Sequence, residues 1–372
     1  MMRQDIRNRL YALIGAGVVG LAATASWSQS LTWLGTLGGS GSFAYGVSAD
    51  GRVIVGVSGN ASGYLRAFRW TRAMGMQDLG TLGGTDSWAY GVSADGRVIV
   101  GGAYNASSYG RAFRWEGGVM QDLGTLGGAY SAAYGVSADG GVVVGMAHNA
   151  SGYGRAFRWE GGVMQDLGTL GGAYSTASGV SADGRVVVGE AEDANGYRRA
   201  FRWESGVMQD LGTLGGAYST ASGVSADGRV IVGGAQNASG YGRAFRWTQT
   251  TGIRDLGTLG GDISEAFGVS ADGSVVVGAE EDASYEWRAF RWTPAGRMEN
   301  LNLTYARLLT DGSVLLAARA ISPDGRYIVG YGLNAPTGRI EAFLLDTVPE
   351  PASLMALSAG LAGLLGLRRL VR

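Results

Sequence analysis

The fold is decided by residues 89–126, which read AYGVSADGRVIVGGAYNASSYGRAFRWEGGVMQDLGTL. A short β-compatible segment at 89–92 is followed by a turn at 93–96, where Asp can bond the nearby backbone and Gly can adopt positive φ. A β-branched strand at 97–100, a polar loop, a strand at 111–115, a Gly turn and a strand at 119–126 follow. Four short strands in a unit of 44 residues predict one antiparallel, four-stranded sheet.

This unit recurs along the chain with a nearly fixed period. The motif Leu-Gly-Thr-Leu-Gly-Gly returns every 44 or 45 residues and ends in a degenerate seventh copy, beginning at Leu34, Leu79, Leu123, Leu167, Leu211, Leu256 and Leu301. A fixed period in the forties is typical of a solenoid or a propeller. No window has an apolar period of 3.6 residues long enough for a helix, which argues against an α-solenoid.

The third strand of each unit carries the aromatic residues of the expected core. Phe68 and Trp70 alternate with Ala67 and Arg69, so the two rings share one face of the strand. We expect this face to pack between neighbouring units.

The two ends of the repeat region indicate a closed ring. The seventh unit has three strands and ends at Leu345, whereas residues 31–34 form an unpaired strand of the fourth type. Docking this strand on the seventh unit would complete it and remove the open edge. We therefore predict an all-β, seven-bladed β-propeller over residues 26–347, made of four-stranded repeats of about 44 residues. A β-solenoid remains the alternative.

Residues 1–25 have the pattern of a secretory signal peptide. Arg3, Arg7 and Arg9 precede an apolar run at 10–23, and Ala23 and Ala25 are the small residues expected before a cleavage site. The alternative is an N-terminal membrane helix that is not removed.

The C-terminal segment 348–372 resembles a PEP-CTERM sorting tail. Val348, Pro349, Glu350 and Pro351 precede sixteen uncharged residues at 352–367, and an Arg cluster closes the chain. The resemblance implies an exported protein that is held at the inner membrane of a Gram-negative bacterium by its tail and is then recognised by an exosortase. A plain C-terminal membrane anchor is the alternative.

The repeats themselves resemble the HAF family of probable extracellular repeats. The resemblance rests on the Arg-Ala-Phe-x-Trp and Asp-Leu-Gly-Thr-Leu-Gly-Gly motifs and covers residues 31–347. Arg stands where that family has its name-giving His, at Arg66, Arg111, Arg155, Arg199, Arg243 and Arg288. The resemblance implies an extracellular location and no enzyme activity.

Composition limits the chemistry that the chain can support. The chain has no Cys, which excludes disulfides and Cys-based metal sites, and His148 is its only histidine. A formal net charge of −1 gives no global field to attract nucleic acid. Each Ser-Ala-Asp-Gly turn offers calcium one carboxylate, whereas calcium takes about six to eight oxygens. We expect no cofactor and at most weak calcium binding.

Functional residues are expected at the positions where the repeat units differ in sequence. The segment after Leu-Gly-Gly and the loop after the second strand vary, and in a four-stranded meander both lie on the same face of the disc. Carboxylates and aromatic rings on this face suit a carbohydrate or a cation, and solubilising charge is the alternative. The candidate binding residues are Glu190, Glu192, Asp193, Asp262, Glu265, Glu280, Glu281, Asp282, Trp88 and Tyr104.

Three functions are compatible with these observations. The first is a cell-surface or matrix module that binds polysaccharide or another protein without catalysis. The second is a structural biofilm-matrix component without a specific ligand. The third is a glycosidase or lyase with paired carboxylates, against which the near-identity of the repeats argues. The longer insertion at Tyr305 to Arg319 is expected to cap the ring or to contact a partner.

Overall fold

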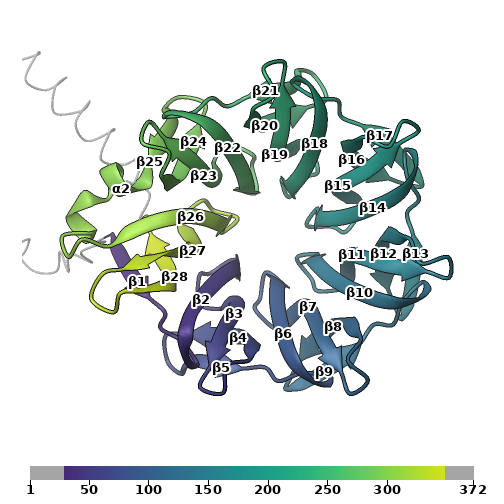
Figure 1. The fold of residues 1–372 in the computed structure, drawn as a ribbon, viewed down its shortest axis with the longest axis horizontal. Coiled ribbons are helices and arrows are strands. Elements are labelled where there is room, and N and C mark those ends of the chain that lie inside the picture. Colours follow the sequence, from purple (N-terminus) through teal and green to yellow (C-terminus); the bar gives the residue numbers. More distant parts are fainter. Residues whose placement is uncertain (1–28, 348–372) are drawn as a thin grey trace, which may run out of the picture.

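The computed structural model describes residues 29–347, which form seven four-stranded antiparallel sheets arranged in a ring (Figure 1). Residues of all seven innermost strands line a central channel. The predicted seven-bladed β-propeller is therefore confirmed. The signal segment with Ala23 and Ala25, and the tail with Val348, Pro349, Glu350 and Pro351, lie outside the described residues. Within residues 29–347, no helix is long and apolar enough to cross a membrane.

The strands of each blade follow the chain order from the channel outward, and the first three blades are β2 (Gly38–Val47), β3 (Ile54–Asn60), β4 (Leu65–Thr71), β5 (Gly75–Asp78); β6 (Gly83–Val92), β7 (Val98–Asn105), β8 (Gly110–Glu116), β9 (Val119–Asp122); and β10 (Gly127–Val136), β11 (Val142–Asn149), β12 (Gly154–Glu160), β13 (Val163–Asp166). The next three are β14 (Gly171–Val180), β15 (Val186–Asp193), β16 (Arg198–Glu204), β17 (Val207–Asp210); β18 (Gly215–Val224), β19 (Val230–Asn237), β20 (Gly242–Thr248), β21 (Gly252–Asp255); and β22 (Gly260–Val269), β23 (Val276–Asp282), β24 (Trp287–Thr293), β25 (Arg297–Asn300). Blade 7 contains β26 (Val314–Ile321), β27 (Tyr327–Asn334), β28 (Arg339–Asp346) and β1 (Ser30–Trp33).

The predicted turn at 93–96 is confirmed and its side chains stabilise it. Asp95 Oδ1 accepts hydrogen bonds from Ser93 Oγ at 2.7 Å and from the Arg97 N–H at 3.0 Å. Gly96 has φ of +73°, a conformation that side chains disfavour. The Ser93 hydroxyl in turn accepts the Val98 N–H at 3.0 Å, which joins the turn to the second strand.

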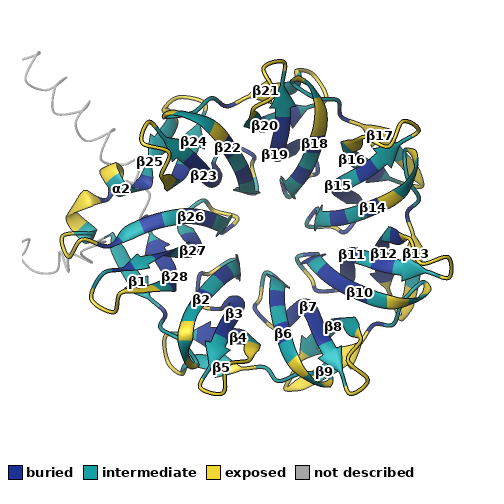
Figure 2. Ribbon diagram, in the orientation of Figure 1, coloured by how far each residue is buried: buried dark blue, intermediate teal, exposed yellow. Residues whose placement is uncertain are grey.

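The core lies between neighbouring blades, as predicted from the aromatic third strand (Figure 2). Phe157 and Trp159 of blade 3 pack with Val98 and Val100 of blade 2 in one buried cluster. Burial of one such side chain stabilises a fold by about 1.5 to 3 kcal/mol. A buried serine adds a polar link, because Ser131 Oγ accepts the N–H of residue 112 in the preceding blade at 2.9 Å.

The ring closes where the sequence predicts it. β1 pairs with β28 in antiparallel register, from Ser30 opposite Asp346 to Trp33 opposite Phe343. Consecutive blades are also linked by backbone bonds between their Ala-Asp turns, from the Ala49 N–H to the residue 94 carbonyl and so on around the ring. In blade 7 Pro323 occupies this position, and because proline has no N–H it cannot donate the corresponding bond to blade 1.

The innermost strands are longer than predicted. The segment after Leu-Gly-Gly was expected to be a variable connection, but β6 already begins at Gly83 and pairs there with Asn105. The two strands approach so closely that a Cβ on Gly84 would lie 2.7 Å from the Tyr104 carbonyl oxygen. Glycine is therefore required for pairing at a point where its own strand propensity is low.

Each innermost strand contains a β-bulge, which lies just before a Gly-Val pair in blades 1 to 6 and before Ala320-Ile321 in blade 7. In blade 2 the register shifts between Ala89 and Gly91, which leaves Tyr90 as the extra residue. Gly101 on β7 permits this arrangement, because a Cβ there would lie 1.9 Å from the Trp88 carbonyl oxygen. Bulges re-aim side chains, and here they direct one residue of each blade toward the channel.

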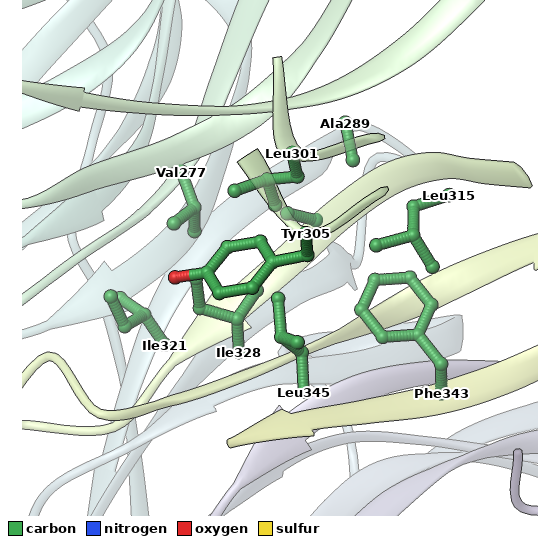
Figure 3. Close-up of a cluster of buried hydrophobic side chains, with 10 residues drawn as sticks. Val277, Ala289, Leu301, Tyr305, Leu315, Ile321, Ile328, Phe343 and Leu345 are labelled. Carbon is green, nitrogen blue, oxygen red and sulfur yellow. The ribbon is translucent and has the colours of Figure 1, made fainter. Parts of the chain in front are cut away.

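The insertion of blade 7 follows α2 (Leu301–Thr304), which lies at the outer rim (Figure 1). It starts with Tyr305 and the short 3₁₀ turn η1 (Ala306–Leu308), and from Val314 on it is the innermost strand β26. The insertion is therefore part of blade 7 itself, and the expectation that it caps the ring is wrong. Leu301 and Tyr305 are buried with Ile328 and Leu345 (Figure 3). The insertion therefore fills the interface between blades 6 and 7.

Candidate functional site

The two faces of the disc differ in sequence variability. The start of each innermost strand lies beside the end of the second strand, as the bridge between Leu82 and Asn105 shows. The variable segments therefore share one side, as predicted, and we call it the loop face. The Ser-Ala-Asp-Gly turns lie at the other ends of the same strands and form the turn face.

In blades 1 to 6 the Asn or Asp that begins the loop between the second and third strands is structural. Asn149 Oδ1 accepts the N–H groups of Ser151 and Tyr153 at 3.0 and 3.1 Å. The Asn that begins the Asn-Ala-Ser triplet at 149–151 thus stabilises a turn through its side chain.

Two of the candidate binding residues occupy this same structural position. Asp193 accepts the Tyr197 N–H at 3.0 Å, and that backbone bond contributes to holding the pKa of Asp193 below its usual range. Asp282 forms the equivalent turn and an ion pair with Arg288 at 3.2 Å. Neither carboxylate is therefore a free ligand group.

Glu280 does not lie on the loop face, so its prediction as an exposed binding residue is wrong. Its side chain is 0% exposed, and Oε2 accepts the Leu259 N–H at 3.0 Å while Oε1 is buried without a partner. In blade 1, Ser58 stands at the position of Glu280, and its hydroxyl accepts the equivalent backbone N–H, that of Leu37, at 3.0 Å. Burial raises the pKa of Glu280 above its ordinary value.

Glu190 and Glu192 are brought together in a small cavity of about 220 Å³ between blades 3 and 4. His148, Tyr174 and Arg198 also line it. Glu190 pairs with Arg198 at 3.1 Å, and Glu192 accepts the N–H of residue 173 at 3.1 Å. Both carboxylates are thus engaged by groups of their own blade.

The other candidates are dispersed. Trp88 and Tyr104 form an edge-to-face pair in blade 2, with ring centroids 5.8 Å apart. Asp262 and Glu281 are half-buried in blade 6. Among residues 29–347 no group of three or more acidic or histidine side chains is arranged to hold a metal ion.

A larger cavity of about 560 Å³ occupies the central channel. The bulged residues of all seven blades line it: Tyr45, Tyr90, Tyr134, Ser178, Ser222, Phe267 and Arg319. The residue type at this position varies between blades, whereas the Gly-Val pair that follows it is the same in six of them. Of the candidates only Glu265 lies here. Sequence reasoning missed the seven positions, although variation directly before a constant motif was the signal that could have found them.

The lining of the channel is asymmetric. Consecutive rings stand close together on one side, with centroids 5.5 Å apart for Tyr45 and Tyr90 and 5.2 Å for Tyr90 and Tyr134. The Arg319 guanidinium lies 3.8 Å from the Phe267 ring centroid and 5.6 Å from that of Tyr45. Hydroxyl groups of blades 4 and 5 line the other side.

Burial shifts the titration of several channel residues. It raises the pKa of the Tyr90 and Tyr134 phenols, which therefore remain protonated at neutral pH. Burial also raises the pKa of the Glu265 carboxyl, and the charge of Arg319 acts in the opposite direction. The channel thus combines aromatic faces, hydroxyl groups and one guanidinium.

The loop face carries a row of exposed tyrosines. We call the following six the tyrosine belt, with exposed fractions between 42% and 51%: Tyr109, Tyr153, Tyr174, Tyr197, Tyr218 and Tyr241. The belt crosses blade boundaries, because Tyr153 of blade 3 stands edge-to-face with Tyr174 of blade 4 at 5.5 Å.

Comparison with known proteins identifies the C-terminal tail. Residues 347–369 match the PEP-CTERM protein-sorting motif. The chain accordingly carries a signal for export and membrane-associated sorting, which an exosortase recognises. No curated protein matches the sequence. The resemblance of the repeats to the HAF family stays a prediction.

Two solved structures are similar to this chain at low identity. TolB from Acinetobacter baumannii is 15% identical with a TM-score of 0.49, over 68% of this chain and 63% of that chain. Putative TolB from Agrobacterium tumefaciens is 14% identical with a TM-score of 0.42, over 83% and 91%. This chain therefore spans less than two thirds of the Acinetobacter protein's length.

Proposed function

We propose that this exported propeller is a non-catalytic binding module of the cell surface or extracellular matrix, and that its loop face binds polysaccharide. The tyrosine belt is the observation that carries this proposal. About half of each ring stays exposed and available to a ligand, and aromatic residues with a polar tip are enriched at binding surfaces.

The acidic residues support binding rather than catalysis. The carboxylates of Glu190 and Glu192 are held by Arg198 and by the backbone, and Glu280 is buried. A carboxylate pair that hydrolyses a glycosidic bond needs free access to both sides of that bond. We therefore favour a binding module over a glycosidase or lyase.

The test is a titration of the full chain, purified in detergent, against soluble neutral and acidic polysaccharides such as dextran, xyloglucan and polygalacturonate. The variant Tyr153→Ala/Tyr174→Ala removes a contacting pair of the belt. We expect its affinity to fall about tenfold, as the loss of about 1.4 kcal/mol of aromatic contact implies. The control is Val163→Ala/Val207→Ala, which truncates two even more exposed apolar side chains in the turn-face hairpins.

The outcomes separate the competing functions. Binding that is lost only in the tyrosine variant supports the proposal. Absence of binding to every polysaccharide contradicts it and favours a structural matrix component or a protein partner. Shortening of a polysaccharide during the titration would favour the enzyme.

A further inference from the structure

The central channel offers a second site, distinct from the belt on the loop face. Its cavity of about 560 Å³ falls within the range of about 300–1,000 Å³ that is usual for ligand sites. Resting on the proposed function, we propose that the channel holds an acidic sugar residue of the polysaccharide, whose carboxylate is bound by Arg319.

Arg319 supplies the charge recognition. Its guanidinium carbon lies 3.8 Å from the ring centroid of Phe267 and 5.6 Å from that of Tyr45, so cation–π contacts hold the charge at the channel wall. Within residues 29–347 this guanidinium has neither an ion pair nor a hydrogen bond, although Glu265 also lines the channel. A stacked guanidinium without a partner is suited to bidentate recognition of a carboxylate.

The remaining lining selects a sugar rather than a bare carboxylate. Tyr45, Tyr90 and Tyr134 present three neighbouring aromatic rings, which suit the apolar face of a pyranose. Ser178 and Ser222 line the channel as hydroxyl groups that can donate to or accept from sugar hydroxyls. A peptide carboxylate would use the guanidinium but would leave the hydroxyl groups and most of the rings without contacts.

Glu265 is the carboxyl group of the channel lining and stands on the same side as Arg319. Burial raises its pKa, whereas the charge of Arg319 lowers it. Glu265 also packs against the preceding blade, where a Cβ on Gly234 would lie 3.5 Å from its side chain, an ordinary van der Waals distance.

The experiment compares tri-galacturonate with its methyl ester, in which each carboxylate is neutralised by one added methyl group, by calorimetric titration into the full chain in detergent. We expect the acid to bind about tenfold tighter or more, since hydrogen bonds to charged groups contribute about 1.5 to 3 kcal/mol. Arg319→Gln should abolish this difference, whereas Arg52→Gln, on the exposed turn face, should preserve it.

A second variant tests the cavity itself. Ser178→Tyr places in blade 4 the residue that blades 1 to 3 carry at this position, so the variant should fold with an unchanged melting temperature. It narrows the channel and should abolish binding of both trisaccharides. Arg319→Lys, which keeps the charge but loses the planar fork, should retain only part of the preference for the acid.

Several results would overturn the inference. Equal affinity for acid and ester, or a preference for the acid that survives Arg319→Gln, would exclude the proposed role of Arg319. Equal binding of N-acetylglutamate would exclude the sugar. If polysaccharide binding depends on the tyrosine belt but neither trisaccharide binds, the channel site fails and the proposed function stands. If no saccharide of any length binds, the proposed function fails first.

Discussion

Adjacent glycines on β7 provide a sharp test of the packing that shapes the channel. A Cβ on Gly101 would lie 1.9 Å from the Trp88 carbonyl oxygen and 2.8 Å from the Phe113 ring. A Cβ on Gly102 would lie 3.6 Å from the Cβ of Ala132, an ordinary contact. Neither glycine has positive φ, so the two sites differ in space and not in backbone strain.

We expect Gly101→Ala to cost about 3 kcal/mol or more of unfolding free energy. The Trp88 carbonyl oxygen would have to retreat by roughly 1.5 Å to reach ordinary van der Waals separation. That oxygen belongs to the backbone of the bulge, so the neighbouring strand cannot relax by rotating a side chain. Gly102→Ala should be neutral or stabilising by about 0.4 to 1 kcal/mol, because alanine restricts the unfolded chain.

Urea unfolding of both variants, followed by tryptophan fluorescence, measures the difference as a shift of the midpoint at constant slope. Gly101→Ala should also weaken ligand binding in the channel, because Tyr90 is the bulged residue that Gly101 supports. Equal midpoints for the two variants would refute the claim that close backbone approach requires glycine at the bulge.

Three further changes have defined outcomes. Asn149→Ala removes the acceptor of two backbone N–H groups and should destabilise the protein by about 1 to 2 kcal/mol in urea unfolding, whereas Asn149→Asp should be nearly neutral because blades 4 and 6 carry Asp there. Glu280→Gln should stabilise the protein more at pH 8 than at pH 4, since a raised folded-state pKa means that stability is lost as pH rises through it; a stability difference independent of pH would contradict this. Glu350→Ala in the sorting motif should leave unprocessed protein in the membrane fraction, as immunoblotting of fractionated cells would show, and unchanged processing would argue against recognition of this Glu.

Much of the fold was predictable because the turn motifs and the number of strands in the chain both indicate a closed ring of four-stranded sheets. The Ser-Ala-Asp-Gly turn combines an acceptor side chain with a glycine at positive φ, and both features are visible in the sequence. Ring closure followed from a three-stranded last unit and one spare strand at the start. These inferences needed no knowledge of packing distances.

The site was less predictable because the local sequence does not determine how deeply a side chain is buried or in which direction it points. Gly83 and Gly84 suggested a loop, yet close approach of β7 makes them part of a strand. Glu280 resembled a loop carboxylate, although small buried residues such as Ala191 and Ala235 occupy its position in neighbouring blades. The direction of Tyr90 depends on a bulge, and no propensity scale marks a bulge.

Closure by β1 also sets an order of folding. Trp33 and Phe343 pair although they are 310 positions apart, so the ring cannot close until nearly the whole propeller has been made. Until β28 forms, the edges of β1 and β27 stay unpaired, and open strand edges favour misassembly. Residue 346 completes the pairing, and the sorting motif begins at residue 347. The strand that completes the ring is thus followed at once by the sorting signal.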